Sequence, residues 1–73
     1  MNTPNKLQEL EALAERYYDA MYDSRHPTGD YANAKDAFRD AIAVARELGE
    51  TETVERLEAR LAHVKAVFRS QFT

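Results

Sequence analysis

The sequence predicts an all-α protein, either a three-helix bundle or a helical hairpin plus one further helix. Three segments carry apolar residues at alternating spacings of three and four, which is the period of one helix face. Good helix formers are abundant, whereas the 73 residues contain only two Gly and two Pro. A chain of this length supplies one hydrophobic core at most, so we expect residues 1–73 to form a single helical domain.

The first helix is expected over residues 4–23. Thr3 is a suitable N-cap, and Pro4 fits the first helical position, where its missing N–H leaves no hydrogen bond unmade. Residues 24–29 have the composition of a loop, and His26 is biased towards extended backbone because a proline follows it. The side chains predicted to face the core form one stripe, which Leu13, Tyr18 and Tyr22 widen: Leu7, Leu10, Ala14, Tyr17 and Met21.

The second helix is expected over residues 30–48. Gly49 favours the left-handed conformation that ends many helices, and Arg46 in the last turn complements the helix dipole. Ile42 and Val44 flank the apolar stripe, which is rich in alanine and therefore lets a neighbouring backbone approach closely. The stripe consists of Tyr31, Ala34, Phe38, Ala41, Ala45 and Leu48.

The third helix is expected over residues 51–71, with Thr51 as its N-cap. Only two or three residues link it to the second helix, so the two should form an antiparallel hairpin with facing stripes. Its large apolar residues can interdigitate with the alanines of the second helix. They are Val54, Leu57, Leu61, Val64 and Phe68.

Residues 29–50 resemble the second half of a tetratricopeptide repeat. The Gly-Asp-Tyr run at residues 29–31 stands where that family places the turn that opens its second helix. Ala34, Phe38 and Ala41 follow at the family's spacing of small, aromatic and small residues. The resemblance implies a helical hairpin, in which the first helix pairs with the second, and a role in binding other proteins.

No residue pattern predicts catalysis, a cofactor or a metal site. The chain has no Cys, and His26 and His63 are not spaced as a pair of ligands on one helix. The two glycines lie too far apart to build a phosphate-binding loop. Carboxylates pair at i,i+4 on the polar helix faces, where no cleft is expected to shift their pKa values: Glu11–Glu15, Asp19–Asp23 and Asp36–Asp40. We therefore expect a protein that is not an enzyme.

Charge is unevenly distributed along the chain, whose net charge is −3. Residues 1–24 carry five acids and two bases, whereas residues 59–73 carry Arg60, Lys65 and Arg69 and no acid. Two interpretations remain open. In the first, the opposite charges complement one another within or between chains; in the second, the three bases form a patch that docks an acidic partner.

Nucleic-acid binding is a weaker alternative. It would require the helix at residues 51–71 to act as a basic recognition helix. Glu52, Glu55 and Glu58 occupy the first half of that helix and would face phosphates unfavourably. The negative net charge also opposes affinity for a phosphate backbone.

Tyrosines gather around the end of the first helix and the loop that follows. Tyr17, Tyr18 and Tyr22 cannot all face one core at helical spacing. In one interpretation Tyr17 and Tyr31 are core residues and Tyr18 reaches the surface. In the other, an exposed patch docks a partner or a second subunit, because Tyr combines a large contact area with a polar tip. That patch consists of Tyr18, Met21, Tyr22 and Arg25.

We expect a non-catalytic protein–protein interaction module, a small adaptor or inhibitor that binds a larger protein through a helical face. A phage- or plasmid-encoded inhibitor of a host protein and a nucleic-acid-binding helical regulator are the alternatives. A homodimer is expected because a short chain without disulfides buries a small core. The N-terminal residues lack the features of a signal peptide, and no uncharged stretch could span a bilayer, so we expect a cytoplasmic protein.

Overall fold

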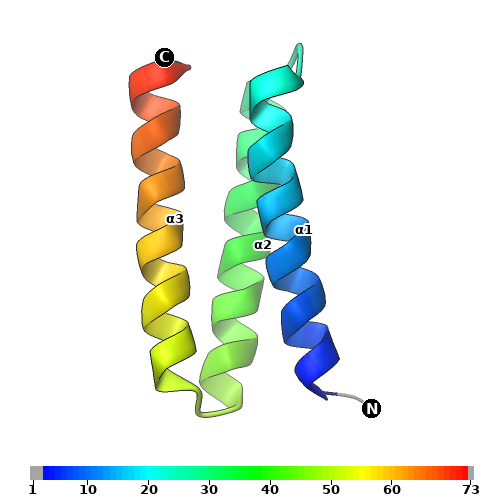
Figure 1. Ribbon diagram of the computed structural model, residues 1–73, viewed down its shortest axis with the longest axis vertical. Coiled ribbons are helices and arrows are strands. Elements are labelled where there is room, and N and C mark those ends of the chain that lie inside the picture. Colours follow the sequence, from blue (N-terminus) through cyan, green and yellow to red (C-terminus); the bar gives the residue numbers. More distant parts are fainter. Residues whose placement is uncertain (1–2, 73) are drawn as a thin grey trace.

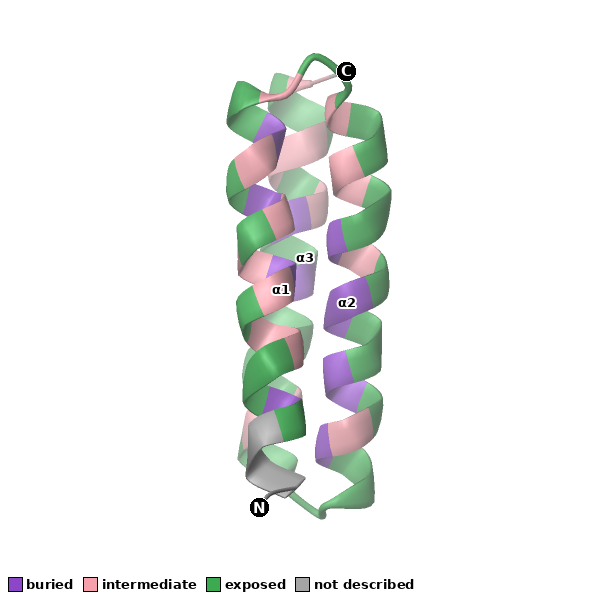
Figure 2. Cartoon of the chain, turned by 90° about the vertical axis from the view of Figure 1, so that its right-hand side faces the viewer, coloured by how far each residue is buried: buried purple, intermediate pink, exposed green. Residues whose placement is uncertain are grey.

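Three helices of 21 residues each form an up-and-down bundle in the computed structural model, which describes residues 3–72 and the side chains of residues 6–72. Helix α1 spans Thr3–Asp23, α2 spans Pro27–Glu47 and α3 spans Thr51–Gln71. α1 and α3 run in the same direction and α2 runs against both (Figure 1). α3 lies behind the α1–α2 pair when the bundle is turned by 90° (Figure 2). The prediction of an all-α three-helix bundle is confirmed.

The core runs along the inner faces of the three helices (Figure 2). Each predicted stripe contributes to it, and the fully buried large side chains are Phe38, Met21, Leu57 and Val64. No polar or charged residue is buried among the described side chains. The bundle is therefore held by apolar packing, with all charges left at or near the surface.

Small side chains bring α2 close to its neighbours. Ala34, Ala41 and Ala45 are fully buried, and Ala37 is 5% exposed. Because a methyl group is the only bulk at these positions, α1 lies against α2 along its length (Figures 1 and 2). The predicted alternation of small residues on α2 with large residues on α1 and α3 is present.

The loop between α1 and α2 is shorter than predicted. It comprises residues 24–26, because α2 begins at Pro27 rather than at Asp30. Pro27 costs nothing at the first helical position, and the His26 carbonyl already accepts hydrogen bonds from the backbone N–H groups of Gly29 and Asp30. The first turn of α2 therefore contains the glycine that was expected to lie in the loop.

The turn between α2 and α3 is a Schellman motif. The Gly49 N–H donates to the Arg46 carbonyl at 3.0 Å, and the Glu50 N–H donates to the Ala45 carbonyl at 2.9 Å. Gly49 has φ = 74°, which confirms the predicted left-handed C-cap. Leu48 was predicted to be a core residue, but it lies just past the end of α2 and is 37% exposed.

The helix starts differ in detail from the predicted caps. Glu50 is the N-cap of α3, and Thr51 is the first helical residue rather than the cap. The Thr53 hydroxyl lies 3.2 Å from a Glu50 carboxylate oxygen and donates to it, which orders this turn. The capping roles predicted for the side chains of Thr3 and Pro4 lie outside the described side chains.

Candidate interaction site

The patch predicted from the tyrosines is only partly at the surface. Tyr22 is 49% exposed, and Arg25 is exposed in the loop between α1 and α2. Tyr18 is 8% exposed and Met21 is 1% exposed. The expectation that Tyr18 and Met21 are presented to a partner is therefore wrong, and the four residues do not form one open surface.

One interpretation of the sequence placed Tyr17 in the core and Tyr18 at the surface. The structure shows the reverse order of burial, since Tyr18 is buried and Tyr17 is half-buried. Tyr18 lies on the side of α1 that faces α3. Its ring meets the His63 ring edge-to-face at a centroid distance of 6.3 Å, and the Arg60 guanidinium carbon lies 5.0 Å from its ring centroid. The buried stripe of α1 is therefore widened at Tyr18, as its spacing predicted, because α3 covers this side of the helix.

Aromatic rings close the end of the bundle where α1 ends, α2 begins and α3 ends. The Tyr31 and Phe68 rings stack with their centroids 3.9 Å apart, and Phe72 stacks on Phe68 at 5.8 Å. Tyr22 meets Phe72 edge-to-face at 5.5 Å. These contacts join all three helices, so the aromatic cluster at this end is mainly a packing element.

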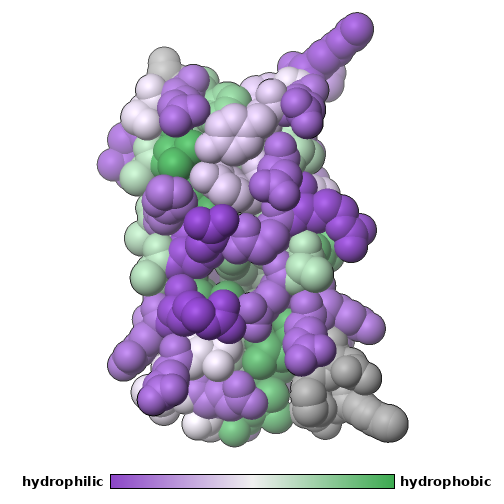
Figure 3. Space-filling view, in the orientation of Figure 1, coloured by the Kyte–Doolittle hydropathy of each residue, from purple (hydrophilic) through white to green (hydrophobic). Residues whose placement is uncertain are grey.

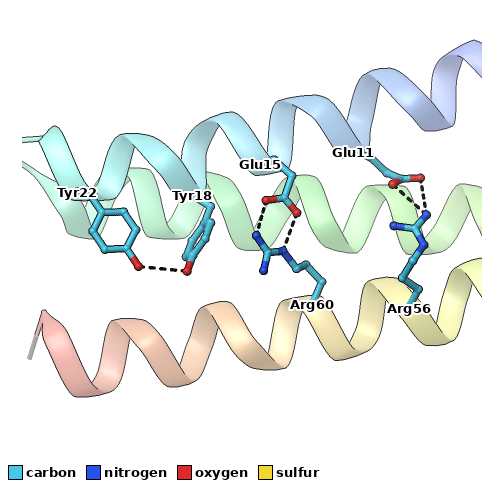
Figure 4. A network of polar contacts seen from close by, with 6 residues as sticks. All are labelled: Glu11, Glu15, Tyr18, Tyr22, Arg56 and Arg60. Atoms are coloured by element: carbon cyan, nitrogen blue, oxygen red, sulfur yellow. Dashed lines mark hydrogen bonds and ion pairs between the residues drawn. The ribbon is translucent and has the colours of Figure 1, made fainter.

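Tyr18 and Tyr22 share a hydrogen bond on the α3 side of α1 (Figure 4). Their hydroxyl oxygens lie 3.1 Å apart, so one hydroxyl donates to the other. This hydrogen bond, together with burial, raises the pKa of Tyr18 to about 12. Tyr22 is thus held against the bundle although half of its surface is open.

Two ion pairs join α1 to α3 (Figure 4). The Arg60 guanidinium donates two hydrogen bonds, of 2.7 and 2.8 Å, to the two carboxylate oxygens of Glu15. The Arg56 guanidinium lies 3.0 Å from a carboxylate oxygen of Glu11. The hydrogen bonds from Arg60 lower the pKa of the Glu15 carboxyl, and the Glu15 carboxylate raises the pKa of Arg60. Charge complementarity between the acidic first helix and the basic third helix is therefore present within one chain.

These charged side chains cover the face of the bundle between α1 and α3. Hydrophilic side chains occupy most of the middle of that face, with hydrophobic atoms visible in patches above and below them (Figure 3). The Glu15 and Arg60 side chains are 41% and 37% exposed, so solvent screens the pair that crosses this face. This side of the molecule is already filled by contacts within the chain.

The predicted basic patch is divided between two sides of α3. Arg60 points towards α1 and is engaged by Glu15. Lys65 lies five residues further on, about 140° around the helix, and faces a groove that α3 shares with α2. Arg69 is exposed and follows Lys65 by four residues, on the same side of α3. The three residues therefore do not form one patch.

A groove runs between α2 and α3 on the side that faces away from α1, and we call it the α2–α3 groove. Its volume is about 290 Å³, and Arg46 also lines a second hollow of about 240 Å³ beside the α2–α3 turn. The residues that line the groove cover about two turns of each helix. Its floor consists of Ile42 and Leu61, which belong to the core and are almost fully buried, and of the exposed Ala62. Its walls carry charged side chains: Arg39, Arg46, Glu58 and Lys65.

The walls of the α2–α3 groove are mainly basic. Arg46 pairs with Glu58 across the groove at 2.7 Å. Arg39 and Lys65 have no ion-pair partner among the residues that the structure describes. Lys35, one turn before Arg39 on the same side of α2, places its ammonium 4.5 Å from the centroid of the Tyr31 ring. An excess of positive charge therefore follows the groove on the α2 side.

A sequence signal for this groove existed in α2 and was missed. Three bases in α2 are each followed directly by an acid, at Lys35-Asp36, Arg39-Asp40 and Arg46-Glu47. Neighbouring residues are 100° apart on a helix, so the bases share one side of α2 and the acids share another. Asp36, Asp40 and Glu47 are all exposed. α2 is thus polarised across its width, with its positive side at the α2–α3 groove.

Groups that would bind a metal do not occur in the described part of the chain, since no three His, Asp or Glu side chains gather there. No helix of residues 3–72 is long and apolar enough to cross a membrane. Comparisons of the chain with protein-family models, with curated proteins and with solved structures found no match.

Proposed function

We propose that this protein is a non-catalytic protein–protein interaction module, a small adaptor or inhibitor that binds a larger protein through the α2–α3 groove. The observation that supports this proposal is the composition of the groove. An apolar floor between cationic walls, on the side of the hairpin that α1 leaves uncovered, suits burial against another protein. The resemblance of residues 29–50 to a tetratricopeptide hairpin agrees with a binding role.

Other faces of the bundle are less suited to this task. Ion pairs within the chain cross the α1–α3 face, which leaves few charges there for a partner. Tyr22 and Leu48 are the exposed large hydrophobic residues of the described chain, and they lie at opposite ends of the bundle. They do not combine into one apolar patch of the kind that marks an interface.

The predicted homodimer would need a face other than the α2–α3 groove. In a two-fold dimer the same patch meets itself, so Arg39 and Lys65 of one chain would approach the same cations of the other. Nucleic-acid binding is also less favoured, because Glu58 stands inside the groove and the apolar floor offers nothing to a phosphate. A different protein as partner is compatible with both the positive charge and the apolar floor of the α2–α3 groove.

Affinity capture with matched variants tests the proposal. Ala62 lies in the groove and Ala59 lies outside it, and both are exposed residues of α3. Purified wild-type protein, Ala62→Arg and Ala59→Arg are immobilised and exposed to extract from the source cell, and the retained proteins are identified by mass spectrometry. We expect a protein retained by the wild type and by Ala59→Arg but not by Ala62→Arg. Retention by all three proteins, or by none, would contradict the proposal.

A further inference from the structure

We infer that the segment of the partner that occupies the α2–α3 groove is an acidic amphipathic helix. This inference rests on the proposed function and states the chemistry of its ligand. It follows from three properties of the groove: its position between two antiparallel helices, its apolar floor, and the excess of positive charge on its walls.

The shape of the groove fits a helix. Its lining residues run from Arg39 to Arg46 on α2 and from Glu58 to Lys65 on α3, which corresponds to about two turns, or about 11 Å, of each helix. The two helices lie side by side with opposite directions, and α1 packs against α2 away from this groove. A helix laid there would complete a four-helix arrangement and would place its apolar stripe over Ile42, Leu61 and Ala62.

The charges specify the flanks of that helix. Arg39 on α2 and Lys65 on α3 stand on opposite walls, and neither has an ion-pair partner among the described residues. A helix with Asp or Glu on both sides of its apolar stripe would place a carboxylate near each cation. Arg46 already pairs with Glu58, so the need for negative charge is greatest near Arg39 and Lys65.

A second copy of the chain fits the groove poorly. The exposed acids of α2 (Asp36, Asp40 and Glu47) would have to reach the cations of the other copy, either head to tail or reciprocally about a two-fold axis. α2 presents no exposed large hydrophobic side chain of its own, so such a contact would leave the apolar floor of the groove uncovered. A separate amphipathic segment with acidic flanks can pair with the cations of the groove and cover its apolar floor at the same time.

Peptide selection measures the preference of the groove directly. A displayed library carries a fixed apolar stripe at helical spacing, with the flanking positions varied among Glu, Lys, Gln and Ser. Selection uses the full-length wild-type chain, and counter-selection with Ala62→Arg removes peptides that bind elsewhere. We expect enrichment of Glu on both flanks of the stripe, with affinity that falls as salt rises.

Charge-reversal variants then test whether the two groove cations cause the preference. The Kd of an enriched peptide should rise by about tenfold or more for Arg39→Glu/Lys65→Glu, because two attractive contacts become repulsive. The variant Lys6→Glu/Arg16→Glu makes the same change in net charge on exposed residues of α1, and the Kd should stay within about twofold. Circular dichroism verifies that both variants keep the helix content of the wild type.

The inference falls if no enriched peptide depends on the groove, if the enriched flanks are neutral or basic, or if both double variants weaken binding equally. It also falls if the groove variant abolishes binding to duplex DNA or dissociates an oligomer of the wild type. Capture of a cell protein that depends on Ala62 while the enriched peptides are neutral would retain the proposed function and reject the acidic ligand. Acidic enrichment without such capture would support the ligand and reject the cellular role.

Discussion

Glu15 and Arg60 form the main polar link between the first and third helices, with two hydrogen bonds of 2.7 and 2.8 Å between residues 45 positions apart in the sequence. Arg60 also lies over the Tyr18 ring, so the ion pair and the edge of the core meet at one place. An acid of the first helix and a base of the third helix are thus paired within one chain, and Arg60 is engaged by this contact.

Glu15→Gln should lower the free energy of unfolding by about 0.5–1 kcal/mol, because the variant loses the charge–charge interaction and one of two hydrogen bonds in a solvent-screened pair. Urea unfolding followed by circular dichroism measures the difference. Glu9→Gln is the matched control on α1, since Glu9 is exposed and has no ion-pair partner among the described residues. An equal effect of the two substitutions would mean that the pair with Arg60 does not stabilise the bundle.

The contribution of Glu15 should disappear in acid. The pKa of this carboxyl is lowered in the folded state, so its stabilising effect is present above the ordinary value of 4.5 and is lost as pH falls below that value. The difference in unfolding free energy between wild type and Glu15→Gln should therefore be constant near neutral pH and shrink below pH 4.5. A difference that grows on acidification would contradict the assignment.

Tyr18 should titrate at high pH. Its pKa is raised to about 12, so the neutral phenol stabilises the fold below the ordinary value of 10.0, and this contribution is lost as pH rises towards 12. Ultraviolet absorbance of tyrosinate should show a component with a pKa near 12 in the wild type and in Tyr17→Phe, but not in Tyr18→Phe. Its presence in all three proteins would assign the raised pKa to another residue.

The two glycines should respond to alanine with opposite signs. Gly49 has φ = 74°, so Gly49→Ala should lower the free energy of unfolding by about 1 kcal/mol through backbone strain alone, since no atom lies within 4 Å of the added Cβ. Gly29 lies in the first turn of α2 with equal space around its Cβ position, so Gly29→Ala should raise stability by about 0.4–1 kcal/mol. Thermal unfolding measures both, and destabilisation by Gly29→Ala would place Gly29 in a turn rather than in the helix.

Most of the fold could be predicted from the sequence, because the apolar spacing of each helix and the residues at its ends indicated the same boundaries. The spacing of Phe38, Ala41 and Ala45 predicted the buried side of α2, and Gly49 predicted where that helix stops. The start of α2 was misplaced because Pro27 and Gly29 are typical of loops as well as of the first turn of a helix. Such residues alone do not separate the two possibilities.

The candidate site was harder to predict from the sequence, because it depends on how the three helices are rotated about their axes. The stripe of α1 and its widening included both Tyr17 and Tyr18, but they did not show that α3 would bury Tyr18 more deeply than Tyr17. Position along the chain likewise grouped Arg60 with Lys65, although helical rotation sends them to opposite sides of α3. The repeated base–acid pairs of α2 carried the better signal, because they compare neighbours on one helix and need no knowledge of its packing.

Binding of a ligand in the α2–α3 groove can be observed at a single methyl group, because Ile42 in its floor is the one isoleucine of the sequence. A protein labelled with ¹³C at the isoleucine δ-methyl gives one resonance from the groove, and a methionine ε-methyl label on Met21 reports the buried side of α1. Titration with an enriched acidic peptide should move the Ile42 signal in proportion to the fraction bound and leave the Met21 signal in place. A peptide that binds while the Ile42 signal stays unchanged would contradict the α2–α3 groove as the binding site.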